Sequence, residues 1–275
     1  MPSITIRGLD YWAEVEGSGP PVVLLHGFTG THSTWRALVD DLRDEFTTIA
    51  IDHIGHGQTE SPAAVDRYRM ESAVDDLVEV ARRLDASRAA WVGYSLGGRT
   101  ALQVTARYPE AVAALVTEGA SAGLATDGER SARIAGDEDL ARMIEQEGLL
   151  KFVDYWESIS LWSSQKQTLT DVQRAALRDQ RLAQSGVGLA NSLRGMGTGS
   201  QSWLGDALPR IRVPVLLTAG RLDTKYSELA EEMARAIPGA MVRIIDGAGH
   251  AAHLEQPVEF NAAVVEFLRS VRPTL

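Results

Sequence analysis

Short apolar runs alternate with longer amphipathic stretches along most of the chain. Runs of four or five apolar residues without polar alternation are typical of strands buried on both faces of a parallel sheet. Such strands are expected at 22–25, 47–51, 89–92, 112–116, 213–217 and 241–245. Apolar residues at helical spacing predict helices over 35–46, 70–84, 100–108 and 260–271. Strands that alternate with helices predict an α/β protein with a mostly parallel sheet, right-handed crossovers and flanking helices.

Two segments depart from this alternation. Residues 3–7 and 11–16 alternate apolar and polar side chains around a turn at 8–10, which predicts an antiparallel hairpin. The segment 121–206 is helical, charged and aromatic, without a strand-like run. Because it follows the sixth predicted strand, we interpret it as a helical cap over the carboxyl edge of the sheet, where open α/β sheets bind ligands. The predicted organisation is a core formed by 1–120 and 207–275, with a cap over 121–206.

The composition narrows the class of protein. Of the 275 residues, 44% are apolar and 23% charged, as in globular proteins. The formal charge of −10 argues against nucleic acid or an anionic membrane surface as a partner. The absence of cysteine excludes disulfides and thiolate chemistry, and the histidines lack a carboxylate cluster at ligand spacing, so we expect no metal and no other cofactor. The chain shows neither a signal peptide nor an apolar run of bilayer length, which predicts a cytoplasmic protein.

The sequence Gly93-Tyr94-Ser95-Leu96-Gly97 lies between a predicted strand and a predicted helix. Gly-x-Ser-x-Gly in that context forms a nucleophile elbow. Gly93 and Gly97 lack a Cβ, so the chain can turn sharply and the strand and helix can approach closely. Ser95 then lies at a helix N-terminus, where free N–H groups favour a developing anion. We predict that Ser95 is the reactive residue; the alternative is a glycine-rich turn without catalytic function.

A reactive serine needs an imidazole, which in turn needs an orienting carboxylate. Asp223 and His250 each follow a predicted strand, so both are expected at the same sheet edge as Ser95, in the order that this architecture uses. Asp246 also ends a strand, but it lies on the His250 loop and is interpreted as a turn residue. The remaining histidines are expected elsewhere: as loop braces (His26 and His56), in solvated or local positions (His32 and His53), or directed along the following segment (His253).

Two further sets of groups complete the candidate site. The backbone N–H groups of Phe28 and Leu96 are the candidates for an oxyanion hole. Arg99 lies one helical turn after Ser95, on a helix that such a sheet normally buries, and a buried guanidinium requires an anion. That anion is either a ligand or a structural carboxylate. Cap residues Arg133 and Arg181 would extend Arg99 into a basic island, although a solvated helix face explains these two arginines equally well.

Three motifs together resemble one enzyme family. They are Leu25-His26-Gly27-Phe28-Thr29-Gly30, Gly93-Tyr94-Ser95-Leu96-Gly97-Gly98-Arg99 and Leu193-Arg194-Gly195-Met196-Gly197-Thr198-Gly199. The first is common to α/β-hydrolases, whereas the other two are selective for the synthases of 2-succinyl-6-hydroxy-2,4-cyclohexadiene-1-carboxylate (SHCHC) in menaquinone biosynthesis. The resemblance covers nearly the whole chain and implies the α/β-hydrolase fold. It also implies that Tyr94, Trp156 and Lys225 line the substrate pocket.

By the same resemblance the chain is expected to be a carbon–oxygen lyase. Such an enzyme eliminates pyruvate from 2-succinyl-5-enolpyruvyl-6-hydroxy-3-cyclohexene-1-carboxylate (SEPHCHC) to give SHCHC. Ser95, polarised by His250 and Asp223, would remove a ring proton, and the oxyanion hole would hold the charge that develops on the succinyl carbonyl. The substrate is a small polycarboxylate, which suits bidentate pairing with arginine side chains, here Arg99, Arg133 and Arg181.

Other functions use the same residues. A serine carboxylesterase would employ this triad through an acyl-enzyme. A non-catalytic binding protein of the same fold is disfavoured by the presence of all three triad residue types. Epoxide hydrolases and dehalogenases are excluded because those families have aspartate at the position of Ser95. The sequence leaves open whether the protein is a monomer or a homodimer.

Overall fold

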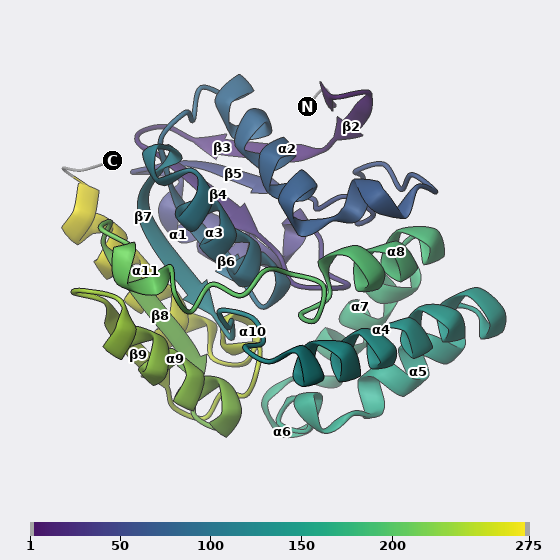
Figure 1. Cartoon of the computed structure of the whole chain (residues 1–275). Coiled ribbons are helices and arrows are strands. Elements are labelled where there is room, and N and C mark those ends of the chain that lie inside the picture. The colour runs from purple at the N-terminus through teal and green to yellow at the C-terminus, as the bar shows by residue number, and fades with distance from the viewer. Residues whose placement is uncertain (1–2, 273–275) are drawn as a thin grey trace.

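A seven-stranded sheet forms the centre of the computed structural model, which describes residues 3–272 (Figure 1). Its strand order is β3-β5-β4-β6-β7-β8-β9, and only the β3–β5 pair is antiparallel. The predicted mostly parallel sheet is therefore confirmed. The strands are β3 (Ala13–Gly17), β4 (Pro21–Leu25), β5 (Thr47–Ile51), β6 (Ala89–Tyr94), β7 (Val112–Glu118), β8 (Val215–Gly220) and β9 (Met241–Ile245).

The N-terminal hairpin is shorter than the sequence predicts. β1 (Ile4–Ile6) pairs with β2 (Leu9–Tyr11) in a separate two-stranded sheet. The predicted strand over 11–16 is interrupted at Trp12, because its N–H donates to the Thr59 hydroxyl (2.9 Å) rather than to a strand. The remainder becomes β3 and joins the main sheet. In chain order the helical segment thus follows the seventh strand, not the sixth.

Helices cover both faces of the sheet and explain the unbroken apolar runs of its strands. On one face α2 (Met70–Arg83), α3 (Leu96–Arg107) and α9 (Thr224–Ala236) contribute to one apolar cluster with the sheet. On the other, α1 (Arg36–Leu42) and α11 (Pro257–Val271) contribute to a second. No helix among residues 3–272 is both long and apolar enough to cross a membrane. Shorter elements are α10 (Ala252–Glu255) and the 3-10 turns η1 (His32–Trp35), η2 (Val65–Tyr68), η3 (Pro109–Ala111), η4 (Ser160–Trp162) and η5 (Leu208–Arg210).

The segment between β7 and β8 forms five helices that gather at one end of the sheet (Figure 1). Three of them share a small apolar cluster around Phe152 and Leu189. We call this segment the cap. Its limits at 121–206, between core parts 1–120 and 207–275, stay a prediction. Residues 1–2 and 273–275 of the predicted core lie outside the described residues. The cap helices are α4 (Asp127–Glu147), α5 (Leu149–Ser158), α6 (Gln165–Thr168), α7 (Asp171–Leu182) and α8 (Gly186–Met196).

Candidate active site

Ser95 occupies a strained turn between β6 and α3. Its φ is +51° and its ψ is −108°, a conformation that residues with a side chain rarely adopt. The Ser95 N–H donates to the carbonyl of Glu118 on the neighbouring strand (2.7 Å). A Cβ on Gly93 would overlap the backbone of Gly97, and one on Gly97 would overlap the carbonyl of Leu25. The close approach expected of both glycines is confirmed, and it fixes Ser95 at the end of the central strand.

The three predicted triad residues come together at the carboxyl ends of their strands. His250 Nδ1 lies 2.7 Å from Asp223 Oδ2, and His250 Nε2 lies 3.1 Å from Ser95 Oγ. Because a carboxylate can only accept, Nδ1 carries the proton and Nε2 is left to accept from the serine hydroxyl. Asp246 instead forms an exposed ion pair with Arg221. The geometry is that of an imidazole ready to polarise Ser95; the catalytic roles themselves stay predictions.

The neighbouring backbone holds the acid and the imidazole in place. Asp223 is the N-cap of α9, and its Oδ1 accepts from the Tyr226 N–H (3.3 Å) while Oδ2 faces His250. Gly119 has a φ of +56°, and a Cβ there would lie 3.0 Å from His250 Cε1. An N-cap carboxylate is oriented by the helix that it caps. Asp223 is therefore fixed by α9, and Gly119 leaves room for the imidazole.

Two backbone N–H groups are available beside Ser95. Leu96 is the first residue of α3, so its N–H has no intrahelical partner. Phe28 lies in the loop after β4, where His26 Nδ1 and the Gly30 N–H both donate to the carbonyl of Gly27. Within residues 3–272 neither the Phe28 nor the Leu96 N–H has a recorded acceptor. Both residues line the same cavity as Ser95, as an oxyanion hole requires.

A cavity of about 520 Å³ opens over Ser95 and His250 between the core and the cap. Tyr94 and Trp156, which the resemblance assigned to the pocket, both line it. The Tyr94 ring packs 5.4 Å from the His250 ring, and burial raises the pKa of its hydroxyl well above the usual value. Further cap residues in the wall include Arg133, Asp137, Tyr155, Trp162, Leu193 and Thr198.

Arg99 lines this cavity as a buried cation without a carboxylate partner. Its side chain is 8% exposed, and Nη1 donates to the Met196 carbonyl (2.9 Å) and to Gln201 Oε1. No carboxylate oxygen of the described chain lies within ion-pair distance of it. Burial, helped by the charge of Arg133, lowers the pKa of Arg99 to about 10, so the guanidinium is still charged at neutral pH. Of the two explanations that the sequence left open, the structure shows no carboxylate in direct contact with Arg99, although the charge of Asp137 acts on it from a greater distance and raises its pKa.

Arg133 also lines the cavity, but a carboxylate accompanies it. Its Nε lies 2.9 Å from both oxygens of Asp137, one helical turn along α4. Asp137 is buried, and that burial raises its pKa despite the opposing effect of Arg133. The basic island is therefore weaker than the sequence predicts at this point, because Asp137 offsets the charge of Arg133.

Arg181 and Lys225 do not line the cavity around Ser95, and their contact with substrate stays a prediction. Arg181 Nη1 is bound to Glu157 Oε1 (2.8 Å), and its guanidinium lies 5.6 Å from the ring centre of Trp162. Trp162 forms the cavity wall, so the indole stands in front of Arg181. Lys225 is exposed on the first turn of α9, with Nζ 5.5 Å from the Tyr226 ring. Arg181 was placed in the pocket by the pattern of cap arginines as well as by the resemblance, and Lys225 by the resemblance alone. In the structure each packs against local partners.

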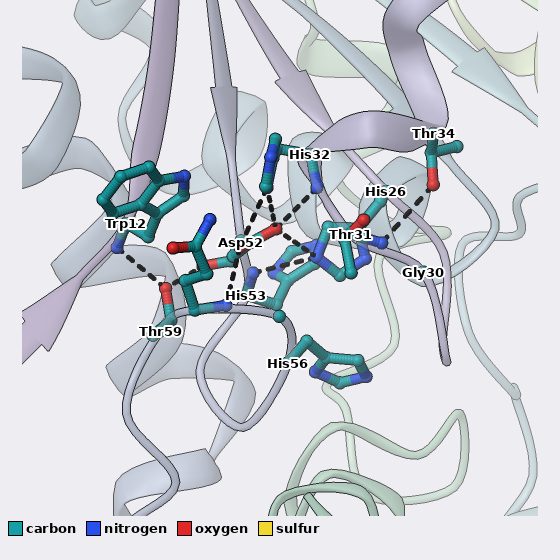
Figure 2. A network of polar contacts seen from close by, with 12 residues as sticks. Trp12, His26, Gly30, Thr31, His32, Thr34, Asp52, His53, His56 and Thr59 are labelled. Atoms are coloured by element: carbon teal, nitrogen blue, oxygen red, sulfur yellow. Dashed lines mark hydrogen bonds and ion pairs between the residues drawn. The ribbon is translucent and has the colours of Figure 1, made fainter. Parts of the chain in front are cut away.

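His26 and His32 take part in a polar network around Asp52, with His53 and His56 close by (Figure 2). His32 Nδ1 lies 3.0 Å from both Asp52 oxygens, while His26 Nε2 accepts from the His53 N–H (3.0 Å). The bracing expected of His26 and His56 is confirmed, since each ring also bonds a loop carbonyl. His53, expected in a solvated or local position, is instead fully buried, and neither ring nitrogen has a partner among residues 3–272.

Lowering the pH from 7 to 5 is expected to destabilise the protein through His53. Burial, with the nearby His56 and Arg99, lowers the pKa of His53 to about 3. In the unfolded chain a histidine has a pKa of about 6.5 and takes up a proton over this range. Because only the unfolded state binds that proton, His53 lowers the free energy of unfolding as the pH falls, by about 2 kcal/mol at pH 5, in addition to what the buried His26 and His56 contribute. Urea unfolding at both pH values measures the change.

His53→Leu supplies the matched comparison for this prediction. The substitution removes the titrating group at a site where the imidazole has no hydrogen-bond partner. The variant is expected to lose about 2 kcal/mol less than the wild type between pH 7 and pH 5. His32→Leu is the control of opposite sign, because the hydrogen bond that His32 donates to Asp52 raises the pKa of His32. Equal pH dependence in the wild type and His53→Leu would contradict a neutral, buried His53.

Sequence reasoning missed several residues around the triad. The rings of Tyr226 and Trp162 pack against His250 at 4.6 and 5.7 Å. His253 does not point along the following segment: its Nδ1 lies 2.8 Å from Glu118 Oε2, and its ring lies 4.5 Å from Tyr94. Only Tyr226 carried a local signal, as the third residue after the Asp223 N-cap. The others depend on packing between elements distant in sequence.

Comparison with known proteins places the chain in a family. A family model described as the alpha/beta hydrolase fold matches residues 20–257. A Bacillus subtilis (strain 168) protein, provisionally assigned as an SHCHC synthase, is 42% identical over 272 residues, which is 98% of each chain. The SHCHC synthase of Serratia proteamaculans (strain 568) is 30% identical over 258 residues, 92% of this chain and 94% of its own.

Solved structures agree with that placement. MenH from S. aureus matches with a TM-score of 0.89 at 29% identity, over 95% of this chain and 98% of that chain. A thermophilic esterase from Thermogutta terrifontis, with malate bound, matches with a TM-score of 0.86 at 28% identity, over 98% of this chain and 97% of that chain. The chain therefore belongs to the α/β-hydrolase fold family. Within that family, its relatives in sequence include the SHCHC synthases.

Proposed function

We propose that the protein is an SHCHC synthase, a lyase that eliminates pyruvate from SEPHCHC. The observation that carries the proposal is Arg99: a buried guanidinium without a carboxylate partner in the described chain, facing the same cavity as Ser95. A buried, uncompensated charge is costly unless an anion binds there. SEPHCHC supplies that anion, and the 42% identical relative supports this choice of substrate.

The triad geometry suits proton removal as well as nucleophilic attack. His250 Nε2 accepts the Ser95 hydroxyl proton, and Ser95 Oγ removes the ring proton next to the succinyl carbonyl. The electrons of that C–H bond form a new ring double bond, the existing double bond shifts by one position, and the C–O bond to the enolpyruvyl group breaks. The released enolpyruvate takes up a proton and becomes pyruvate. The Phe28 and Leu96 N–H groups would stabilise the charge on the succinyl oxygen meanwhile.

The remaining cavity residues would bind and enclose the substrate. Arg99 binds a substrate carboxylate bidentately, and Arg133, whose Nε is held by Asp137, binds a second one through its remaining N–H groups. Tyr94 remains protonated because burial raises its pKa, so its buried, unpartnered hydroxyl is available as a donor. Trp156 supplies an apolar wall. The partner is thus a small polycarboxylate, and the cytoplasm is the proposed compartment of the reaction.

Ester hydrolysis is the second candidate function. The same Ser95–His250–Asp223 geometry permits an acyl-enzyme, and the Thermogutta terrifontis esterase has a closely similar structure, with malate bound. A neutral ester gains nothing from Arg99, whereas an ester that carries a carboxylate does. The two functions therefore differ in the bond that breaks, not in the charge that the cavity accepts.

A coupled assay separates these functions. The purified protein is given SEPHCHC, formed in situ by the preceding enzyme, and pyruvate release and SHCHC absorbance are followed beside hydrolysis of p-nitrophenyl acetate. Rapid pyruvate release with slow ester cleavage is the expected result. Rapid ester cleavage without pyruvate release would overturn the lyase proposal and leave a carboxylesterase.

A further inference from the structure

The cap contacts the loop that carries the Phe28 N–H through a glutamine. Gln184 lies just beyond the end of α7, and its side chain is 8% exposed. Its Nε2 donates to the carbonyls of Thr29 (3.3 Å) and Gly30 (3.2 Å), and its Oε1 accepts from the Gly57 N–H (3.0 Å). Both amide hydrogens and the amide oxygen are therefore engaged, and the side chain joins two core loops to the cap.

The loop that Gln184 contacts needs such support. Thr29 has a φ of +65°, and a β-branched residue is a clear outlier in that region. Strained backbone of this kind persists only where its surroundings hold it. The Gly27 carbonyl is already held by His26 Nδ1 (2.8 Å) and the Gly30 N–H (2.9 Å). The bonds from Gln184 act on the carbonyls of Thr29 and Gly30, so they restrain the loop on the other side of Phe28.

We infer that Gln184 is a positioning residue that fixes the direction of the Phe28 N–H, so that the cap completes the oxyanion hole. A preorganised donor stabilises a developing oxyanion because it needs no reorientation during the reaction. Gln180 Nε2 also donates to the Thr29 carbonyl (3.2 Å), but in the described chain only Gln184 donates to the Gly30 carbonyl. Without Gln184 the loop therefore loses its restraint beyond Thr29, and the Phe28 N–H loses its fixed direction. This inference rests on the oxyanion hole of the proposed function, but not on the identity of the substrate.

Two substitutions test the inference by different means. Gln184→Ala removes both donors, while Gln184→Glu keeps the shape and the acceptor for Gly57 but sets a carboxylate against two carbonyl oxygens. For Gln184→Ala we expect kcat to fall about 10- to 100-fold with KM changed less than about threefold, since one imprecise donor costs part of the loss of a whole one. We expect kcat to fall further in Gln184→Glu than in Gln184→Ala. The control is Asp179→Ala, an exposed residue on the same helix, with unchanged kinetics.

Three readouts make the result independent of the substrate. These are pyruvate release from SEPHCHC, p-nitrophenyl acetate hydrolysis and the rate of Ser95 labelling by a fluorophosphonate. In the labelling reaction the Ser95 Oγ–P bond forms, the P–F bond breaks, fluoride leaves and His250 takes the serine proton. The phosphoryl oxygen needs the same hole, so labelling of Gln184→Ala should slow by a similar factor. Circular dichroism and thermal unfolding establish that both variants are folded.

A merely structural role predicts a different pattern. The inference would be overturned if activity fell only in proportion to the unfolded fraction, or if KM rose with unchanged kcat. It would also be overturned if the fluorophosphonate did not label the wild type. The Gln184→Glu variant adds a pH signature: protonation of its carboxyl restores one donor, so its activity relative to Gln184→Ala should rise as the pH falls. Should the wild type cleave the ester without releasing pyruvate, the proposed function fails, while the ester and labelling readouts still decide the role of Gln184.

Discussion

Replacing Ser95 with alanine is expected to lower kcat for pyruvate release by at least about 10³-fold, because triad residues act as a unit and the remaining groups cannot remove the ring proton. The His250 imidazole, 3.1 Å from Ser95 Oγ in the wild type, then has no hydroxyl to polarise. Steady-state kinetics with SEPHCHC measure the loss. Substrate binding should persist, since the cavity walls and Arg99 are unchanged, and calorimetry with the inactive variant tests that point.

Ser192→Ala is the matched control for Ser95→Ala. Ser192 lines the same cavity, and its buried hydroxyl has no hydrogen-bond partner in the described part of the chain. Removing it deletes the same atom from the same space without touching the triad, so kcat should stay within about threefold of the wild type, whatever the change in KM. Full activity in Ser95→Ala would exclude the triad from the reaction.

The second large effect is expected at Arg99. Arg99→Ala should raise KM for SEPHCHC by about 30- to 1000-fold, the usual result of removing one partner of a buried charge pair. The neutral ester p-nitrophenyl acetate should be affected much less, because it carries no carboxylate. Comparison of KM and kcat for the two substrates measures this difference. Unchanged kinetics with SEPHCHC would count strongly against the lyase proposal.

A variant that leaves Arg99 in place separates charge from packing. Gln201 Oε1 accepts from the Arg99 guanidinium, so Gln201→Glu sets a carboxylate against that cation without changing the size of either side chain. The introduced carboxylate then compensates the charge of Arg99 in place of the substrate. KM for SEPHCHC should therefore rise, as in Arg99→Ala. If only Arg99→Ala raised KM, the loss would reflect a damaged cavity wall rather than a lost charge.

The core and triad were predictable because each key residue is tied to the end of a strand. Ser95, Asp223 and His250 follow runs of apolar residues, and parallel strands bring their carboxyl ends to one edge whatever the details of packing. Even the sharp turn around Ser95 followed from Gly93 and Gly97, although the positive φ of Ser95 itself did not. The division of the second predicted strand at Trp12 did not follow, since it depends on a hydroxyl 47 residues away along the chain.

The cap residues were harder to place because helical periodicity predicts which face of a helix is polar, but not which residues the polar side chains contact. Arg181 was assigned by the pattern of cap arginines and by resemblance, yet it binds Glu157, 24 residues away, and packs against Trp162. Lys225 was assigned by resemblance alone and is exposed. His53 looked like a loop residue with access to water, but the loops around it close over the ring. Gln184 has no motif of its own. Its contacts appear only once the cap is seated on the core.

The Asp223 carboxylate contacts both the His250 imidazole and the N-terminus of α9. Catalytic activity therefore depends on the local stability of that helix end. Asp223 caps α9 with one oxygen and orients His250 with the other, so fraying of the first turn of α9 disorganises the triad while the sheet is still intact. Helix ends open at lower free energy than a central sheet does. On gradual heating, turnover should therefore fail reversibly some degrees before the bulk of the protein unfolds. Opening of the first turn of α9 would thus set the temperature at which turnover stops.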